Sequence, residues 1–284
     1  MKTLKDKVAA ITGAGSGIGR ATSILLARQG CHVAISDLNE TGLAETARDC
    51  KSLGVTVTTK KLDVADRAAV YAWADETVKA HGKANIIINN AGVGLGATVD
   101  EMSYEDFEWL MNINFWGVVY GTKAFLPHLK NSGDGHVVNI SSVFGIISCP
   151  TQSAYNAAKF AVRGFTEALR EEMEIEGCGV GVTSVHPGGI RTNIAKTARF
   201  KTGTEWGMKD QASVAADFEK LARTTPAEAA QDIVNAILKN RRRQLIGNDA
   251  VLIDLVQRFM PESYQRILIA GGKRQRARAL LNND

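Results

Sequence analysis

The sequence lacks the features that mark several classes of protein. Its 284 residues include only four cysteines and five prolines. The cysteines show no metal-binding spacing, so we expect free thiols at Cys31, Cys50, Cys149 and Cys178. No apolar run approaches the ~18 residues of a membrane span, and the short apolar run after residues 1–7 is not a signal peptide. We therefore expect a cytoplasmic protein with no integral membrane association.

A strong excess of charge of one sign is also missing. The formal net charge is +4, from 34 Lys and Arg against 30 Asp and Glu, which is too small to indicate a nucleic-acid partner. Basic clusters at 241–243 and 273–278 are interpreted as solvated charge runs, with an interaction tail as the alternative. Because the histidines lack metal-ligand spacing, we expect no metal. They are His32, His81, His128, His136 and His186.

Strand-like and helix-like segments alternate along the chain. Short apolar, β-rich runs begin near Val8, His32, Val55, Ile86, His136 and Val180, with helical patterns between them. One long helical pattern spans residues 103–129 and has Asn114 at its middle. No Pro-rich or Ser-rich linker interrupts the series. The alternation predicts an α/β fold with a doubly wound parallel sheet in a single domain, residues 1–284.

A glycine-rich turn follows the first predicted strand. The strand Val8–Thr12 leads into Gly13-Ala14-Gly15-Ser16-Gly17-Ile18-Gly19, and a helical pattern follows from Ala21 to Gln29. Glycines allow a tight turn, and a helix N-terminus offers unpaired N–H groups to a pyrophosphate. The next predicted strand, Val33–Ser36, ends in Asp37, close to the acidic position expected to hold a ribose diol. The segment therefore predicts a dinucleotide site.

Tyr155 and Lys159 carry the chemistry of the second candidate site. They are four residues apart, so on a helix they share one face. A fixed positive charge at ~4 Å would lower the pKa of a phenol from about 10 towards the physiological range. Ser142 lies where the strand containing residues 136–141 would end, and ligand sites of open α/β sheets lie at such ends. Tyr155 could then exchange a proton with an alcohol or ketone.

These motifs together resemble those of the short-chain dehydrogenase/reductase superfamily over nearly the whole chain. The residues that carry the resemblance are Thr12-Gly13-Ala14-Gly15-Ser16-Gly17-Ile18-Gly19, Asp63-Val64, Asn89-Asn90-Ala91-Gly92, Asn114, Ser142, Tyr155, Lys159 and Pro187-Gly188 with Thr192. The resemblance implies a Rossmann-type sheet of about seven strands with helices on both faces. It also implies a homodimer or homotetramer.

The resemblance also implies a role for each motif residue. Asn114 would hold a relay water, Ser142 would orient the substrate oxygen, and Tyr155 would be the acid/base. Lys159 would acidify Tyr155 and bind the nicotinamide ribose. Besides Tyr155 and Lys159, the implied cofactor contacts are Gly13, Gly15, Ser16, Gly17, Ile18, Gly19, Asp37, Leu38, Asp63, Val64, Asn90, Ala91, Gly92, Pro187, Gly188, Ile190 and Thr192.

The expected cofactor is NAD, because Asp37 would repel a 2′-phosphate and Leu38 supplies no cation beside it. We expect an NAD(H)-dependent oxidoreductase that interconverts a secondary alcohol and a ketone. The pocket residues implied by the resemblance are mainly apolar, which favours a hydrophobic or bulky substrate. They are Val93, Leu95, Ser142, Val143, Phe144, Tyr155, Asn193 and Trp206. Sugars, steroids, terpenoids and aromatic alcohols all remain open. The alternative is a non-catalytic dinucleotide sensor or a scaffold that binds through its basic tail.

Two segments near the C-terminus carry further expectations. Residues 188–225 are expected to form a substrate-binding lid. Residues 249–284 are expected to form a helical extension and a basic tail. An apolar stripe predicts a helix that Pro261 interrupts, made by Val251, Leu252, Leu255, Val256 and Phe259. We expect residues 273–278 to be disordered, because they lack apolar periodicity.

Overall fold

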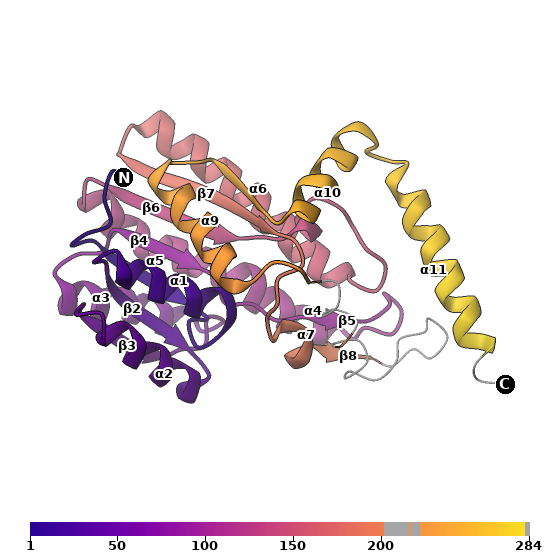
Figure 1. Cartoon of the computed structure of the whole chain (residues 1–284), viewed down its shortest axis with the longest axis horizontal. Coiled ribbons are helices and arrows are strands. Elements are labelled where there is room, and N and C mark those ends of the chain that lie inside the picture. The colour runs from indigo at the N-terminus through magenta and orange to yellow at the C-terminus, as the bar shows by residue number, and fades with distance from the viewer. Residues whose placement is uncertain (202–215, 217–221, 282–284) are drawn as a thin grey trace.

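The computed structural model describes residues 1–201, 216 and 222–281. Its main element is a seven-stranded parallel sheet in the order β3-β2-β1-β4-β6-β7-β9 (Figure 1). The strands are β1 (Val8–Thr12), β2 (His32–Asp37), β3 (Val57–Lys61), β4 (Ile86–Asn89), β6 (Gly135–Ile140), β7 (Val180–Pro187) and β9 (Arg243–Ile246). The predicted doubly wound parallel sheet is confirmed. The strand order reverses between β1 and β4, and such a reversal leaves a crevice beyond the carboxyl ends of the strands.

Helices cover both faces of this sheet (Figure 1). One face carries α1 (Gly17–Arg28), α2 (Glu40–Lys51) and α9 (Pro226–Leu238), which pack on alternate strand residues such as Ile11 and Ile35. The other face carries α3 (Arg67–His81), α5 (Gly117–Asn131) and α6 (Ser153–Glu176), which pack on the intervening residues, such as Ala10 and Ile87. Strands that are buried on both faces need consecutive apolar residues, which explains the short apolar runs in the sequence.

Side-chain caps fix where several of these helices begin. Asn39 and Asp66 accept hydrogen bonds from Gly42 N–H and Ala69 N–H at the starts of α2 and α3. Thr225 and Glu228 form a reciprocal capping box at the start of α9. Each cap satisfies N–H groups that have no partner inside the helix. The caps therefore set the lengths of the loops at the carboxyl edge of the sheet.

The long helix predicted over residues 103–129 is present, but its middle is wider than an α-helix. It consists of α4 (Tyr104–Met111), a π-helical turn (Asn112–Trp116) and α5. Asn114 lies in the π-helical turn and is fully buried. Single π-turns inside helices often occur at functional sites.

Short elements close the loops above the sheet. β5 (Leu95–Gly96) pairs in parallel with β8 (Arg199–Phe200), which follows α7 (Ile194–Thr197). A further bridge joins Ala97 to Gln152, the residue before α6. These pairings hold the loop after β4 against the segment that follows β7. Residues 202–215 and 217–221, which make up much of the expected lid, lie outside the described residues.

The C-terminal extension forms two helices, α10 (Asn248–Phe259) and α11 (Tyr264–Leu281), at one end of the molecule (Figure 1). The predicted break at Pro261 is confirmed. The predicted disorder of residues 273–278 is wrong, because α11 runs through them. Within the described ranges, no helix has the length and apolarity needed to cross a membrane.

Candidate active site

The glycine turn between β1 and α1 is built for close backbone approach. Gly13 and Gly17 have φ angles of +65° and +53°, in the left-handed region that favours glycine. A Cβ on Gly13 would stand 2.8 Å from the Ala91 Cα, and one on Gly19 would stand 2.2 Å from the Gly13 carbonyl oxygen. Side chains at these positions would collide with backbone. The turn can therefore bring the N-terminus of α1, from Ser16 through Gly19, up to a bound anion.

Asp37 ends β2 beside this turn, and its carboxylate has a fixed orientation. One oxygen accepts a 2.8 Å hydrogen bond from Gly15 N–H, and the other accepts one of 2.8 Å from Asn39 N–H. Leu38, the next residue, is 56% exposed and adds no positive charge. The structure thus brings together the glycine turn and the acidic residue that the sequence placed near each other.

Thr12 joins the turn to the loop after β4, a role that the sequence analysis did not assign to it. Its hydroxyl oxygen accepts 3.0 Å hydrogen bonds from both Asn90 N–H and Ala91 N–H. The Asn90 amide donates in return to the carbonyl oxygens of Thr12, at 2.9 Å, and Gly13, at 3.1 Å. The loops that follow β1 and β4 are therefore one hydrogen-bonded unit on either side of the strand-order reversal.

Asp63 and Val64 lie just beyond the end of β3, at the same edge of the sheet. Asp63 is exposed and accepts a 2.9 Å hydrogen bond from Ala65 N–H. Val64 is 7% exposed, and its side chain lies within 2.8 Å of where a Cβ on Gly117 would stand. Both residues are placed at the crevice edge, as the sequence indicated, and Gly117 is needed to leave room for Val64.

Ser142, Tyr155 and Lys159 converge at the end of β6. Ser142 follows this strand, and the other two lie on one face of α6. The Lys159 ammonium lies 5.5 Å from the centre of the Tyr155 ring and donates a 3.0 Å hydrogen bond to the Ile140 carbonyl oxygen. Phe144 packs edge-on against the Tyr155 ring at 6.1 Å. The predicted trio is therefore assembled at the carboxyl edge of the sheet.

The pKa values of this trio differ from those expected from the sequence. Burial raises the pKa of Tyr155 to about 12, and its hydrogen bond with the Ser142 side chain offsets only part of this effect. Burial also lowers the pKa of Lys159 to about 8. Burial disfavours the charged form of each group, and it is the largest cause of both shifts. The chain by itself therefore does not show the lowered Tyr155 pKa expected from the sequence.

The Asn114 side chain has a backbone partner in the loop after β4. Its amide oxygen accepts a 2.8 Å hydrogen bond from Val93 N–H, and its amide nitrogen donates one of 2.8 Å to the Val93 carbonyl oxygen. A Cβ on Gly92 would stand 3.3 Å from the Asn114 oxygen and 3.7 Å from the Lys159 ammonium nitrogen. Asn114 thus positions the loop after β4 beside Lys159. Position 92 of this loop has little space for a side chain larger than that of glycine.

The segment after β7 closes the other side of the crevice. Pro187 ends the strand, and the Gly189 N–H donates a 2.7 Å hydrogen bond to the carboxylate of Asp249 from α10. The Asp249 carboxylate would also collide with any side chain at Gly188. Thr192 lies within 3.1 Å of where a Cβ on Gly17 would stand, so this segment reaches the glycine turn. Ile190, in the same segment, is buried. No sequence pattern indicated the role of Asp249, because its partner lies 60 residues away.

His186 is a further residue near the site, to which the sequence analysis assigned no role. One ring nitrogen lies 3.1 Å from the Ser142 carbonyl oxygen, and the other lies 3.0 Å from the Ser184 hydroxyl. Burial lowers the pKa of His186 to about 4, so the ring is neutral at physiological pH. The ring therefore holds the backbone of Ser142 from the neighbouring strand.

The residues expected to contact substrate fall into three groups. Val93, Leu95 and Tyr155 share one apolar cluster. Val143 and Phe144 follow Ser142 in a short 3-10 turn, and Asn193 precedes α7. Trp206 lies outside the described residues. Among the described residues, no group of three or more His, Cys, Asp or Glu side chains could hold a metal ion.

Comparison with known proteins agrees with this geometry. The short chain dehydrogenase family model matches residues 7–202. SadH of Mycobacterium tuberculosis, which is named as an oxidoreductase, is 49% identical over 272 residues, covering 95% of this chain and 97% of SadH. Estradiol 17-beta-dehydrogenase 11 of Macaca fascicularis is 31% identical over 272 residues, covering 94% of this chain and 83% of its own length.

A solved structure extends the comparison to the cofactor. A short chain dehydrogenase/reductase from Burkholderia phymatum, determined in complex with NAD, superposes with a TM-score of 0.83 at 30% sequence identity. The match covers 92% of this chain and 96% of the Burkholderia chain. The chain is therefore an oxidoreductase with a Rossmann-type fold, and it belongs to the short-chain dehydrogenase/reductase family.

Proposed function

We propose that the protein interconverts a secondary alcohol and a ketone with NAD(H), and that Tyr155 is the general acid/base. The convergence of Ser142, Tyr155 and Lys159 at the carboxyl edge of the sheet carries this proposal. In ketone reduction, Tyr155 would donate its phenolic proton to the substrate oxygen while a hydride is added to the carbonyl carbon. In alcohol oxidation the same proton returns to the phenolate. Ser142 would hold the substrate oxygen beside the phenol.

The nicotinamide carries the hydride in both directions, and its positive charge in the oxidised form would favour the phenolate of Tyr155. The chain's own residues would hold the dinucleotide along the crevice. The glycine turn would bind the pyrophosphate, and Asp37 would accept hydrogen bonds from the adenosine ribose hydroxyls. Lys159 would reach the nicotinamide ribose. The remaining cofactor positions predicted from the sequence are expected to line the same crevice.

NAD is the proposed cofactor because of the charge at Asp37. A 2′-phosphate on the adenosine ribose would stand beside this carboxylate, whose orientation Gly15 and Asn39 fix. Leu38 provides no compensating cation. The NAD complex of the Burkholderia relative is consistent with this choice.

The proposed substrate is hydrophobic or bulky. Val93 and Leu95 pack in the apolar cluster that contains Tyr155, and a substrate bound beside them would meet apolar surface, which favours apolar ligands. The name of one relative, estradiol 17-beta-dehydrogenase 11, describes the oxidation of a bulky secondary alcohol. We further propose that the chain assembles as a homodimer or homotetramer, since Trp116 and Phe160 leave apolar surface exposed on the π-helical turn and α6.

The substitution Tyr155→Phe tests the proposed mechanism. It removes the transferable proton and keeps the ring that packs on Phe144, so we expect kcat to fall by about 10²- to 10⁴-fold. NADH affinity, measured by fluorescence titration, should change little. Tyr71→Phe, at an exposed tyrosine on α3, is the matched control and should retain activity.

Two outcomes would contradict the proposal. Near-normal turnover in Tyr155→Phe would exclude Tyr155 as the acid/base. NADH binding without turnover of any secondary alcohol or ketone by the wild-type chain would instead favour the dinucleotide sensor.

A further inference from the structure

Asp249 lies at the start of the C-terminal extension, between two glycines. It belongs to the first turn of α10, which follows Gly247, and it is an exposed residue. A Cβ on Gly188 would stand 2.2 Å from one oxygen of its carboxylate, and a Cβ on Gly247 would stand 2.4 Å from the other. Any other residue type at either position would collide with the carboxylate. The absence of these two side chains therefore leaves the space that the carboxylate occupies.

The Asp249 carboxylate holds the backbone of the segment that follows β7. It accepts a 2.7 Å hydrogen bond from the Gly189 N–H, and the N–H of the preceding Gly188 donates one of 2.9 Å to the Ile246 carbonyl oxygen of β9. Glycine has the greatest backbone freedom of all residues, and hydrogen bonds to carboxylates are stronger than those between neutral groups. Asp249 therefore restricts the part of the segment that is most free to change conformation.

Residues 188–192 extend from the proposed catalytic residues to the glycine turn. Before the segment begins, His186 of β7 lies 3.1 Å from the Ser142 carbonyl oxygen. At its other end, the Thr192 side chain lies 3.1 Å from where a Cβ on Gly17 would stand. Ser142 marks the proposed site of hydride transfer, and the glycine turn marks the proposed pyrophosphate site. The nicotinamide end of a dinucleotide has to connect these two points, so it would lie along this segment.

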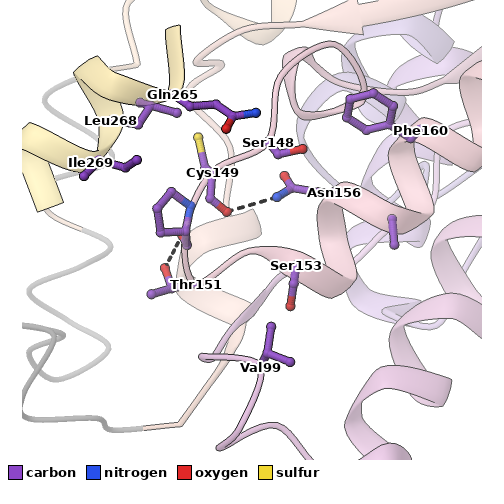
Figure 2. Close-up of a pocket in the computed structure, with 12 residues that line it drawn as sticks. Val99, Ser148, Cys149, Thr151, Ser153, Asn156, Phe160, Gln265, Leu268 and Ile269 are labelled. Atoms are coloured by element: carbon purple, nitrogen blue, oxygen red, sulfur yellow. Dashed lines mark hydrogen bonds between the residues drawn. The ribbon is translucent and has the colours of Figure 1, made fainter. Parts of the chain in front are cut away.

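The C-terminal extension that carries Asp249 is itself anchored to the rest of the fold. Ala250 is fully buried, and Asp254 pairs with Arg243 of β9 at 2.9 Å. Farther along the chain, the Tyr264 hydroxyl accepts a 3.2 Å hydrogen bond from the Ser148 N–H. Figure 2 shows three residues of α11 beside the loop 148–151, namely Gln265, Leu268 and Ile269. A carboxylate on a helix that is fixed in this way can hold a neighbouring loop in one place.

The contacts of Asp249 connect the C-terminal extension to the cofactor crevice. We propose that Asp249 is a positioning residue for the nicotinamide end of NAD(H), because its carboxylate holds the Gly188-Gly189 backbone in the conformation that binds the nicotinamide. This inference rests on the proposed NAD(H)-dependent function. A segment that is ordered before the ligand arrives loses less conformational entropy on binding. Removal of the carboxylate should therefore weaken binding of the nicotinamide and leave binding of the adenosine and pyrophosphate unchanged.

Two ligands separate the nicotinamide from the rest of the cofactor. NADH contains it, whereas ADP-ribose has the same adenosine, pyrophosphate and second ribose without it. In calorimetric titrations of the full chain, Asp249→Ala should raise the Kd of NADH by at least about fivefold, the size expected for one net hydrogen bond, and change the Kd of ADP-ribose by less than about twofold. Equal weakening of both ligands, or unchanged NADH affinity, would overturn the proposal.

A conservative variant separates the hydrogen bond from the charge. Asp249→Asn removes the charge but keeps an oxygen that can accept from the Gly189 N–H, so it should bind NADH nearly as tightly as the wild type. Asn248→Ala, at the exposed neighbour in the same turn, is the matched control and should bind both ligands normally. NADH binding as weak in Asp249→Asn as in Asp249→Ala would show that the hydrogen bond does not position the segment.

Amide exchange tests the position of the segment without any cofactor. In the free chain, the Gly189 N–H should exchange at least about fivefold faster in Asp249→Ala than in the wild type, because it loses its partner. Its exchange in Asp249→Asn should match that of the wild type. Mass spectrometry of peptides that cover residues 188–192 would measure both rates. Equal exchange in Asp249→Ala and the wild type would contradict the inference.

These measurements do not depend on turnover. If the wild-type chain turned over no secondary alcohol or ketone, the proposed reaction would fail, while the comparison of NADH with ADP-ribose would still decide the role of Asp249. If the wild-type chain did not bind NADH, both proposals would fail.

Discussion

At the scale of single residues, Asp37 shows how one side chain can serve both structure and cofactor choice. Its two oxygens accept hydrogen bonds from Gly15 N–H and Asn39 N–H, so the carboxylate is oriented before any ligand arrives. A fixed charge discriminates well, because it cannot turn away from a like charge. The selectivity between NADH and NADPH should therefore depend on this residue.

We expect Asp37→Ser to shift this selectivity towards NADPH. The substitution removes the charge that would oppose a 2′-phosphate and keeps a hydroxyl that can accept from Gly15 N–H. The ratio of kcat/KM for NADH to that for NADPH should fall by about tenfold or more. Leu38→Ser, at the exposed neighbour, is the control and should leave the ratio unchanged. A wild-type preference for NADPH would show that the NAD assignment is wrong.

Local spacing predicted the geometry of the candidate catalytic site better than its pKa values. The four-residue spacing of Tyr155 and Lys159 was enough to place them on one helix face. The pKa of Tyr155 was not predictable, because it depends on how deeply the packed structure buries the phenol. The contacts made by His186 and Asp249 were missed for a related reason, since their partners come from distant parts of the sequence.

At the scale of elements, the apolar runs predicted six of the seven strands in the main sheet and missed β9. Arg243 starts this strand but was interpreted as part of a solvated charge run. In the structure it is half-buried and pairs with Asp254 of α10 at 2.9 Å. A short strand that begins with a charged residue has no clear apolar pattern. The structure explains why Arg243 can start a strand, because Asp254 of α10 pairs with it. The basic half of α11 was not predicted to be helical. Its residues favour a helix but form no apolar face, so the sequence shows no helical pattern there.

Truncation can show which part of α11 the fold needs. Tyr264 and Leu268 pack on Ile146 and Ile147, in the loop between Ser142 and Tyr155. Removing residues 261–284 should therefore uncover this loop, lower the stability by about 2–4 kcal/mol and lower Tm measurably. Removing only residues 271–284 leaves these contacts and should change neither Tm nor kcat. Equal Tm values for both truncated chains would show that α11 does not stabilise the loop.

At the scale of the whole molecule, two buried histidines make the stability depend on pH. His136 is 1% exposed and lies 2.8 Å from the Thr183 hydroxyl, and burial lowers its pKa to about 3. Burial also lowers the pKa of the fully buried His186 to about 4. Both folded pKa values lie below the unfolded value of about 6.5. Below pH 6.5 the unfolded chain therefore binds protons that the folded chain does not.

The stability should accordingly be full above about pH 6.5 and fall as the pH drops towards 3. At pH 5 each histidine should cost about 2 kcal/mol of unfolding free energy. Urea denaturation at pH 7 and pH 5, followed by circular dichroism, would measure this loss. His136→Asn should remove about half of it, whereas His128→Asn, at a histidine on α5 that is only partly buried, should not. Equal stability of the wild type at both pH values would exclude this effect.

The packing of α1 against α9 constrains how the protein can be made. Leu26 and Ala27 of α1 share one buried cluster with Ile233 and Ile237 of α9, yet α9 begins at Pro226, long after α1 ends at Arg28. A ribosome adding about 5–20 residues per second would take about 10–40 s to synthesise the intervening chain. Throughout that time the α9-facing side of α1 has no native cover. The N-terminal half therefore leaves the ribosome before its packing is complete. A chaperone that shields α1 would protect the nascent chain from aggregation.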